Sequence, residues 1–159
     1  MIVYLNRYIQ KITPPEIGGA WFLDEKLINN MKRTKRKLQI GVMGSAADLG
    51  YSKALERLAD AVGSSIAKKG ATLMFGAEKD YDSLSAAACR GAKKAGGLTV
   101  GVTYGRGLNI LERKNTDVII ATGLERGGGR EFSLVVSCDA IICIGGGSGT
   151  LNEIAIAYQ

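Results

Sequence analysis

The sequence contains no histidine, and this absence excludes more chemistry than any other feature of its composition. Without histidine there is no imidazole general base, no serine or cysteine nucleophile activated by an imidazole, and no histidine metal ligand. Any catalysis must therefore rely on carboxylates, Arg, Lys, Tyr, Ser, Thr or Cys.

Cysteine is also scarce. Cys89, Cys138 and Cys143 are an odd number, and none forms the Cys-x-x-Cys pair typical of a zinc or redox site. The last two flank an apolar run, where cysteine commonly packs as a small hydrophobic residue. We therefore expect three buried thiols without a catalytic role.

Long apolar runs are absent as well. None approaches the roughly 20 residues that cross a bilayer, and the N-terminus lacks the features of a secretory signal. Of the 159 residues, 46% are apolar and 23% are charged. This composition predicts a compact globular domain. We expect it to be cytoplasmic and not to bind membranes.

Residues 1–37 differ in texture from the rest and are predicted to be an N-terminal extension of a domain formed by residues 38–159. Both prolines lie in the extension. Residues 1–40 hold 8 basic and 3 acidic side chains, so they supply +5 of the net charge of +6.

Two features of the extension are interpretable. Asp24 can cap a short helix that ends near Met31, because apolar residues recur along one stripe of that segment. The basic run 32–37 is expected to be a solvated linker. A nucleic-acid-binding arm is the less favoured alternative, because no aromatic residues interleave the run.

From residue 38 onward, short apolar runs alternate with segments of helical period, the pattern of parallel strands covered by helices. The expected strands are 38–43, 72–75, 98–103, 118–121 and 140–144. The expected helices are 55–66, 83–95, 125–137 and one that begins near residue 150. The fold class is therefore predicted to be α/β, a Rossmann-like, doubly wound parallel sheet of five or more strands with helices on both faces. Because the last helix is still running at Gln159, we expect either a sheet that ends early or a C-terminally incomplete chain.

The strongest local signal is a glycine-rich segment between the last expected strand and the last expected helix. It consists of Gly145, Gly146, Gly147, Ser148, Gly149 and Thr150. Glycines let the backbone approach an anion closely, and the amides of a helix start attract negative charge. The segment matches neither common nucleotide fingerprint. A tight turn without a ligand is the simpler interpretation, but four glycines in five positions exceed what a turn requires, so we favour a phosphate or carboxylate site.

Glu153 admits two interpretations. Thr150 and Glu153 have the spacing of a capping box, in which the carboxylate accepts a hydrogen bond from the Thr150 amide. Alternatively, Glu153 faces the crevice at the strand ends, where open α/β sheets bind their ligands.

Arg130 lies near the start of an expected helix, an unfavourable place for a cation because of the helix dipole. This position indicates a ligand contact. A surface salt bridge with Glu131 or Glu125 is the alternative, with even weight.

The loops after the first two strands carry weaker signals. Gly44 and Ser45 are small enough to form the wall of a base or ribose site. Glu78, Asp80 and Asp82 are expected to be solvated charges, since they lack the glycine and distant glutamate of a calcium loop. We predict no metal site and no resident cofactor.

Taken together, these residues resemble the LOG superfamily, which includes the LONELY GUY phosphoribohydrolases, the molybdenum cofactor carrier proteins and relatives of the DprA nucleotide-binding fold. The resemblance covers residue 38 to the end. It rests on Arg130, the stretch 137–140 and the segment 146–153, which is similar to the family's P-G-G-x-G-T-x-x-E signature. It implies a Rossmann-like sheet, a nucleotide or nucleotide-like ligand, and homo-oligomers.

In the hydrolase branch the matching arginine and glutamate are catalytic. The resemblance thus implies that Arg130 positions a nucleoside 5'-monophosphate and that the turn amides hold its phosphate. It also implies that Glu153 stabilises the ribosyl transition state or orients water as the N-glycosidic bond breaks.

Three departures from the hydrolase pattern favour the carrier-like or an uncharacterised branch. Gly145 replaces a proline, Asn152 replaces the first of two glutamates, and the loop 76–82 is acidic where a glycine-rich loop is expected. Our first hypothesis is a nucleotide-binding protein with phosphoribohydrolase activity. The alternative is a non-catalytic carrier or sensor of molybdenum cofactor or a nucleotide.

Overall fold

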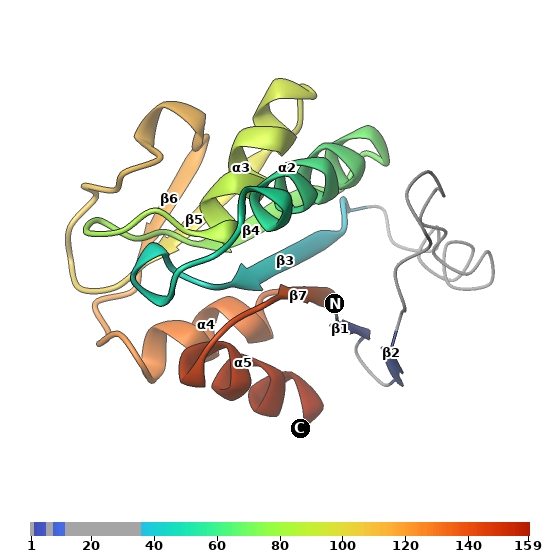
Figure 1. The fold of residues 1–159 in the computed structure, drawn as a ribbon. Coiled ribbons are helices and arrows are strands. Elements are labelled where there is room, and N and C mark those ends of the chain that lie inside the picture. Colours follow the sequence, from blue (N-terminus) through green and yellow to red (C-terminus); the bar gives the residue numbers. More distant parts are fainter. Residues whose placement is uncertain (1, 6–7, 12–35) are drawn as a thin grey trace.

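The computed structural model describes residues 2–5, 8–11 and 36–159. Figure 1 shows one sheet with helices on both of its faces. The predicted helix from Asp24 to Met31 and most of the basic run lie outside the described residues. The division of the chain at residue 37 stays a prediction.

In the described residues the sheet has seven strands, in the order β2-β1-β7-β3-β4-β5-β6, of which the last five in this order are parallel. The parallel strands are β3 (Gln39–Gly44), β4 (Thr72–Gly76), β5 (Thr99–Thr103), β6 (Val118–Ala121) and β7 (Ala140–Ile144). All five were predicted to within about a residue, because strands covered on both faces are continuous apolar runs. The predicted Rossmann-like parallel sheet is confirmed.

Two further strands come from the N-terminal segment, where only a linker and a helix were expected. β1 (Ile2–Leu5) pairs antiparallel with β7, with Ile2 opposite Cys143, and β2 (Tyr8–Lys11) pairs antiparallel with β1. Both segments are rich in β-branched and aromatic residues, which was the available signal. Each of these strands has only four residues, too few to show a periodic pattern of apolar residues in the sequence.

The helices divide between the two faces, as predicted. One face carries α2 (Lys53–Lys68) and α3 (Leu84–Lys94), and the other carries α4 (Gly129–Val136) and α5 (Ser148–Tyr158), as Figure 1 shows. Two short 3-10 turns, η1 (Ala47–Leu49) and η2 (Arg113–Asn115), interrupt the loops. No helix in the described part of the chain is both long and apolar enough to cross a membrane.

Two glycines lie where α2 and α3 meet. A Cβ atom at Gly91 would lie 1.9 Å from the Asp60 carbonyl oxygen, and one at Gly63 would lie 1.9 Å from the Ala88 carbonyl oxygen. The two glycines therefore set the close contact between the helices.

The helix expected at 125–137 begins only at Gly129. The backbone before it is not helical, because Gly127 has φ +86° and Gly128 has φ −156°. Arg126 consequently lies in a loop.

The strand order places a crevice at the carboxyl ends of β3 and β7. The chain leaves β3 toward the α2 face and leaves β7 toward the α5 face, so the two connections separate on opposite sides of the sheet. Ligands of open α/β sheets bind at such switch points.

Candidate functional site

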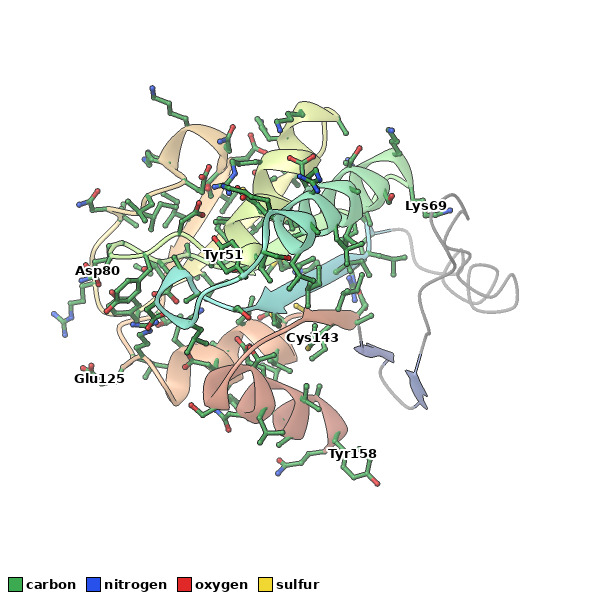
Figure 2. All side chains as sticks on the ribbon, in the orientation of Figure 1. Tyr51, Lys69, Asp80, Glu125, Cys143 and Tyr158 are labelled. Atoms are coloured by element: carbon green, nitrogen blue, oxygen red, sulfur yellow. The ribbon has the colours of Figure 1, made fainter. Side chains whose placement is uncertain are left out.

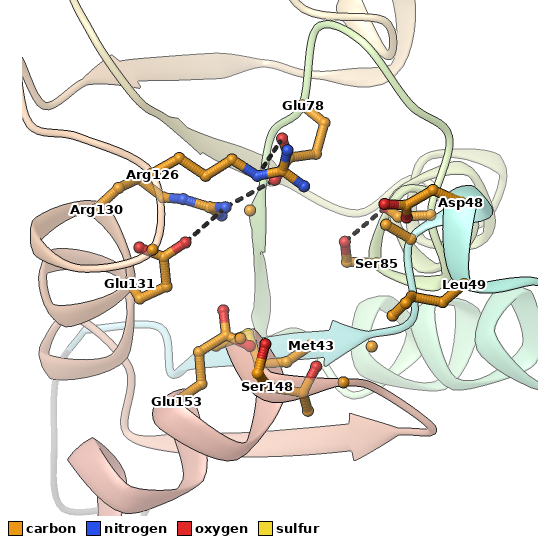
Figure 3. A pocket seen from close by; sticks show the side chains of 18 of the residues that line it. Met43, Asp48, Leu49, Glu78, Ser85, Arg126, Arg130, Glu131, Ser148 and Glu153 are labelled. Atoms are coloured by element: carbon orange, nitrogen blue, oxygen red, sulfur yellow. Dashed lines mark hydrogen bonds and ion pairs between the residues drawn. The ribbon is translucent and has the colours of Figure 1, made fainter.

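A cavity of about 440 Å³ opens at this crevice. Its walls come from the segments after β3, β4 and β7 and from the first turns of α4 and α5 (Figure 3). This volume lies within the range of small-molecule pockets, roughly 300–1,000 Å³.

The glycine-rich turn forms one wall, and two of its glycines are required by the backbone. Gly145 has φ +61° and Gly146 has φ +120°, conformations that other residues rarely adopt. The amide of Gly146 donates a 2.8 Å hydrogen bond to Ser45 Oγ. Ser45 and Gly146 thus fix the shape of the turn and do not line the cavity.

Four other residues of the turn, and Gly44 at the end of β3, face the cavity. Gly44, Gly147, Ser148, Gly149 and Thr150 all line it. A Cβ atom at Gly149 would meet nothing within 4 Å, so packing does not explain this glycine. Because α5 begins at Ser148, the amides of its first turn have no partner within the helix and are available to an anion.

Arg130 is buried, with only 4% of its surface exposed. Its Nη2 atom lies 2.7 Å from Glu78 Oε1 and 2.9 Å from Glu131 Oε1. The predicted salt bridge with Glu131 therefore exists, but it is buried. The alternative partner Glu125 contributes its backbone carbonyl, which accepts a 3.3 Å hydrogen bond from the Arg130 amide.

Glu78 was expected to be a solvated charge, and this expectation is wrong. Its side chain is 8% exposed and pairs with Arg130 and Arg126. Glu78 lies two residues after the end of β4. Because β4 is the neighbour of β3, whose carboxyl end lines the cavity, this position brings Glu78 to the cavity. The other two acids of the loop also have partners, since Asp82 pairs with Arg90 and Asp80 accepts a hydrogen bond from Tyr104.

Glu153 lies within α5 and is 8% exposed. The predicted capping box is wrong, because the helix begins at Ser148 and Thr150 is already inside it. Figure 3 shows the Glu153 carboxyl group directed into the cavity. Burial raises the pKa of Glu153 to about 7, although the charge of Arg130 opposes this shift.

Arg126 also lines the cavity, and we did not assign it a role from the sequence. Its side chain is 39% exposed, and its Nε atom lies 3.6 Å from Glu78 Oε2. Its guanidinium group lies 5.0 Å from the centre of the Tyr81 ring. The signal in the sequence was the pair of arginines around the triplet 127–129.

The three cysteines are free thiols, of which Cys89 and Cys143 are buried and Cys138 is half-buried. Burial raises the pKa of each thiol to about 12, which disfavours the reactive thiolate. No group of three His, Cys, Asp or Glu side chains suited to a metal ion occurs among the residues that the structure describes.

Known proteins share the fold of this chain. An uncharacterized protein of Archaeoglobus fulgidus is 38% identical, over 77% of this chain and 74% of its own length. The molybdenum cofactor carrier protein of Chlamydomonas reinhardtii superposes with a TM-score of 0.67 at 33% identity, over 77% of this chain and 71% of that one. The molybdenum cofactor binding protein of the phototrophic bacterium Rippkaea orientalis superposes with a TM-score of 0.68 at 34% identity, over 78% of this chain and 72% of that one.

A family model covers most of the chain. The SLOG cluster4 family matches residues 37–159, which include all five parallel strands, the glycine-rich turn and the cavity. The LOG-type resemblance inferred from the sequence is therefore confirmed, and the chain belongs to the SLOG cluster4 family.

Proposed function

We propose that the chain binds a phosphate-bearing nucleotide or nucleotide-like molecule in this cavity and carries it unchanged. The first turn of α5 would hold the phosphate, because its free amides and the helix dipole favour an anion. The two structural relatives, a carrier and a binding protein of molybdenum cofactor, make that molecule the first candidate for the cargo.

The contacts of Arg130 with two carboxylates favour a carrier over a hydrolase. In the hydrolase interpretation this arginine positions the substrate. Here its guanidinium group is held by two buried carboxylates, those of Glu78 and Glu131. A substrate that displaced these carboxylates would have to break a buried ion pair, which is costly, although the Nε atom of Arg130 has no hydrogen-bond partner.

A phosphoribohydrolase is the second candidate, and Glu153 favours it. A carboxyl group that faces the cavity with a pKa of about 7 is suited to move a proton near neutral pH. The same property lowers the fraction of carboxylate that could stabilise a positively charged ribosyl transition state.

The binding proposal is tested by releasing and identifying the small molecules that co-purify with the full chain, by mass spectrometry and molybdenum analysis. We expect a phosphate-bearing heterocycle in near-stoichiometric amount. A panel of nucleoside 5'-monophosphates is then titrated against the protein. If nothing co-purifies and none of the panel binds, the proposal is overturned.

The Glu153→Gln variant separates the two candidates. A carrier retains its affinity in this variant, and neither protein releases free base from the panel. Multiple-turnover release of base by the wild type, lost in the variant, would establish the hydrolase instead.

The predicted homo-oligomer and the cytoplasmic location stay predictions. The outer face of α4 exposes Phe132 and Val136, with 53% and 58% of their surfaces accessible. Adjacent apolar side chains on one helix face are a contact surface for a second copy. Light scattering of Phe132→Ser would show a smaller mass than that of the wild type if this face forms the oligomer.

A further inference from the structure

Arg126 and Arg130 both line the cavity, but their binding capacities differ. Arg130 is buried and its Nη2 atom is shared by two carboxylates, although its Nε atom has no hydrogen-bond partner. The guanidinium group of Arg126 meets Glu78 only through a 3.6 Å approach, which is an ion pair beyond hydrogen-bond distance. Tyr81 is its other polar neighbour, and these two contacts leave most of its N–H donors without a protein acceptor.

The partner of Arg126 is unsatisfied too. Glu78 Oε2 is buried and accepts no hydrogen bond, although Glu78 Oε1 accepts one from Arg130. A buried acceptor without a donor is unfavourable and usually marks a place where a ligand or water completes the network. An unsaturated donor group and an unsatisfied acceptor thus lie side by side at the cavity.

Separating Arg126 from Glu78 costs little free energy. Arg126 is partly exposed, so its attraction to Glu78 is screened by solvent. Glu78 would keep its partner Arg130 when Arg126 turns toward a ligand. Gly127 and Gly128 follow Arg126, and a Cβ atom at either would meet nothing within 4 Å, so neighbouring atoms do not confine this loop.

We propose that Arg126 and Glu78 together recognise the ring edge of the ligand, and that they select a fused heterocycle presenting a carbonyl oxygen next to an N–H group. This inference rests on the proposed function, in which the first turn of α5 holds the phosphate. The planar fork of arginine binds a carbonyl oxygen and the adjacent ring nitrogen, as it does in guanine. The free oxygen of Glu78 accepts the neighbouring N–H.

Two ligand classes present this edge, the 6-oxopurines and the oxo-pterins. A 6-aminopurine presents an amino donor in place of the carbonyl, and that donor faces the arginine unfavourably. The cavity is thus expected to discriminate among nucleotides that carry the same phosphate.

The test is calorimetric titration of the full chain with GMP, IMP and AMP. We expect GMP and IMP to bind about 10-fold or more tightly than AMP, the value of one good bidentate contact. In Arg126→Gln the affinities for GMP and IMP fall to that for AMP. Arg113→Gln, in the exposed turn η2 away from the cavity, retains the preference.

Equal affinities of the wild type for GMP and AMP overturn the inference, as does a preference that survives in a folded Arg126→Gln protein, and both leave the proposed function standing. If the wild type binds none of the three nucleotides, the proposed function fails for nucleotides and the inference fails with it. Thermal melting of each variant establishes that it is folded.

Discussion

Glu78 and Arg130 form a 2.7 Å ion pair between the end of β4 and the first turn of α4, and both side chains are more than nine-tenths buried. The pair is a structural link between two segments that form the cavity. In Figure 2, side chains lie between the sheet and the helices.

Removing the positive charge of Arg130 is expected to destabilise the protein strongly. In Arg130→Gln the carboxylates of Glu78 and Glu131 lose their shared partner while they remain buried. We expect a loss of about 3–5 kcal/mol in the free energy of unfolding, measured with denaturant. The control is Arg126→Gln, which is expected to cost less than about 1 kcal/mol because that ion pair is partly exposed. Equal stabilities of the two variants would contradict this account.

Gly76 is expected to be required for the same ion pair. A Cβ atom at this position would lie 1.9 Å from Arg130 Nη1, so Gly76→Ala must displace the guanidinium group. We expect a loss of about 1–3 kcal/mol, the usual cost of overpacking. The matched control is Gly107→Ala, where a Cβ atom would meet nothing within 4 Å. If both variants unfold at the same denaturant concentration, the guanidinium group of Arg130 does not need the space that Gly76 leaves.

These contacts also show where sequence reasoning succeeded and where it stopped. The five parallel strands follow from continuous apolar runs, and the glycine-rich turn follows from its composition, because both signals are local. The burial of Glu78 depends on Arg130, 52 residues away, and no local pattern encodes that meeting. The capping-box interpretation of Glu153 failed because that spacing is a local rule, and the N-cap is Gly147, three residues before Thr150.

Glu153 is expected to make stability depend on pH. Burial holds its pKa at about 7 in the folded protein, above its value in the unfolded chain. The folded state therefore binds the proton more tightly, which stabilises the protein. This contribution to the free energy of unfolding is complete below about pH 4.3 and is lost as the pH rises through 7. The full loss is about 4 kcal/mol.

The measurement compares the wild type with Glu153→Gln in denaturant unfolding between about pH 5 and 8. The wild type should lose stability relative to the variant as the pH rises, because glutamine cannot ionise. Parallel stability curves over this range would show that Glu153 is not the titrating group.

A negative charge at the start of α5 is expected to weaken ligand binding without harming the fold. Ser148 is exposed in the first helical turn, so the carboxylate of Ser148→Glu interacts favourably with the helix dipole but repels a phosphate. We expect the affinity for GMP to fall at least about 10-fold, while thermal stability is unchanged or higher.

The matched control is Ser65→Glu, which introduces the same charge at an exposed position of α2 outside the cavity. Its affinity for GMP should equal that of the wild type. A similar loss in both variants would indicate a general effect of net charge and not a phosphate site at α5.

The most direct test of the central claim is an NMR titration of the isotope-labelled full chain with GMP, in which the shift of every backbone amide is followed. If the first turn of α5 holds the phosphate, the largest changes occur at the amides of Gly147, Ser148, Gly149 and Thr150, and inorganic phosphate at high concentration reproduces their direction. Binding that leaves these four amides unmoved and shifts others would contradict the account.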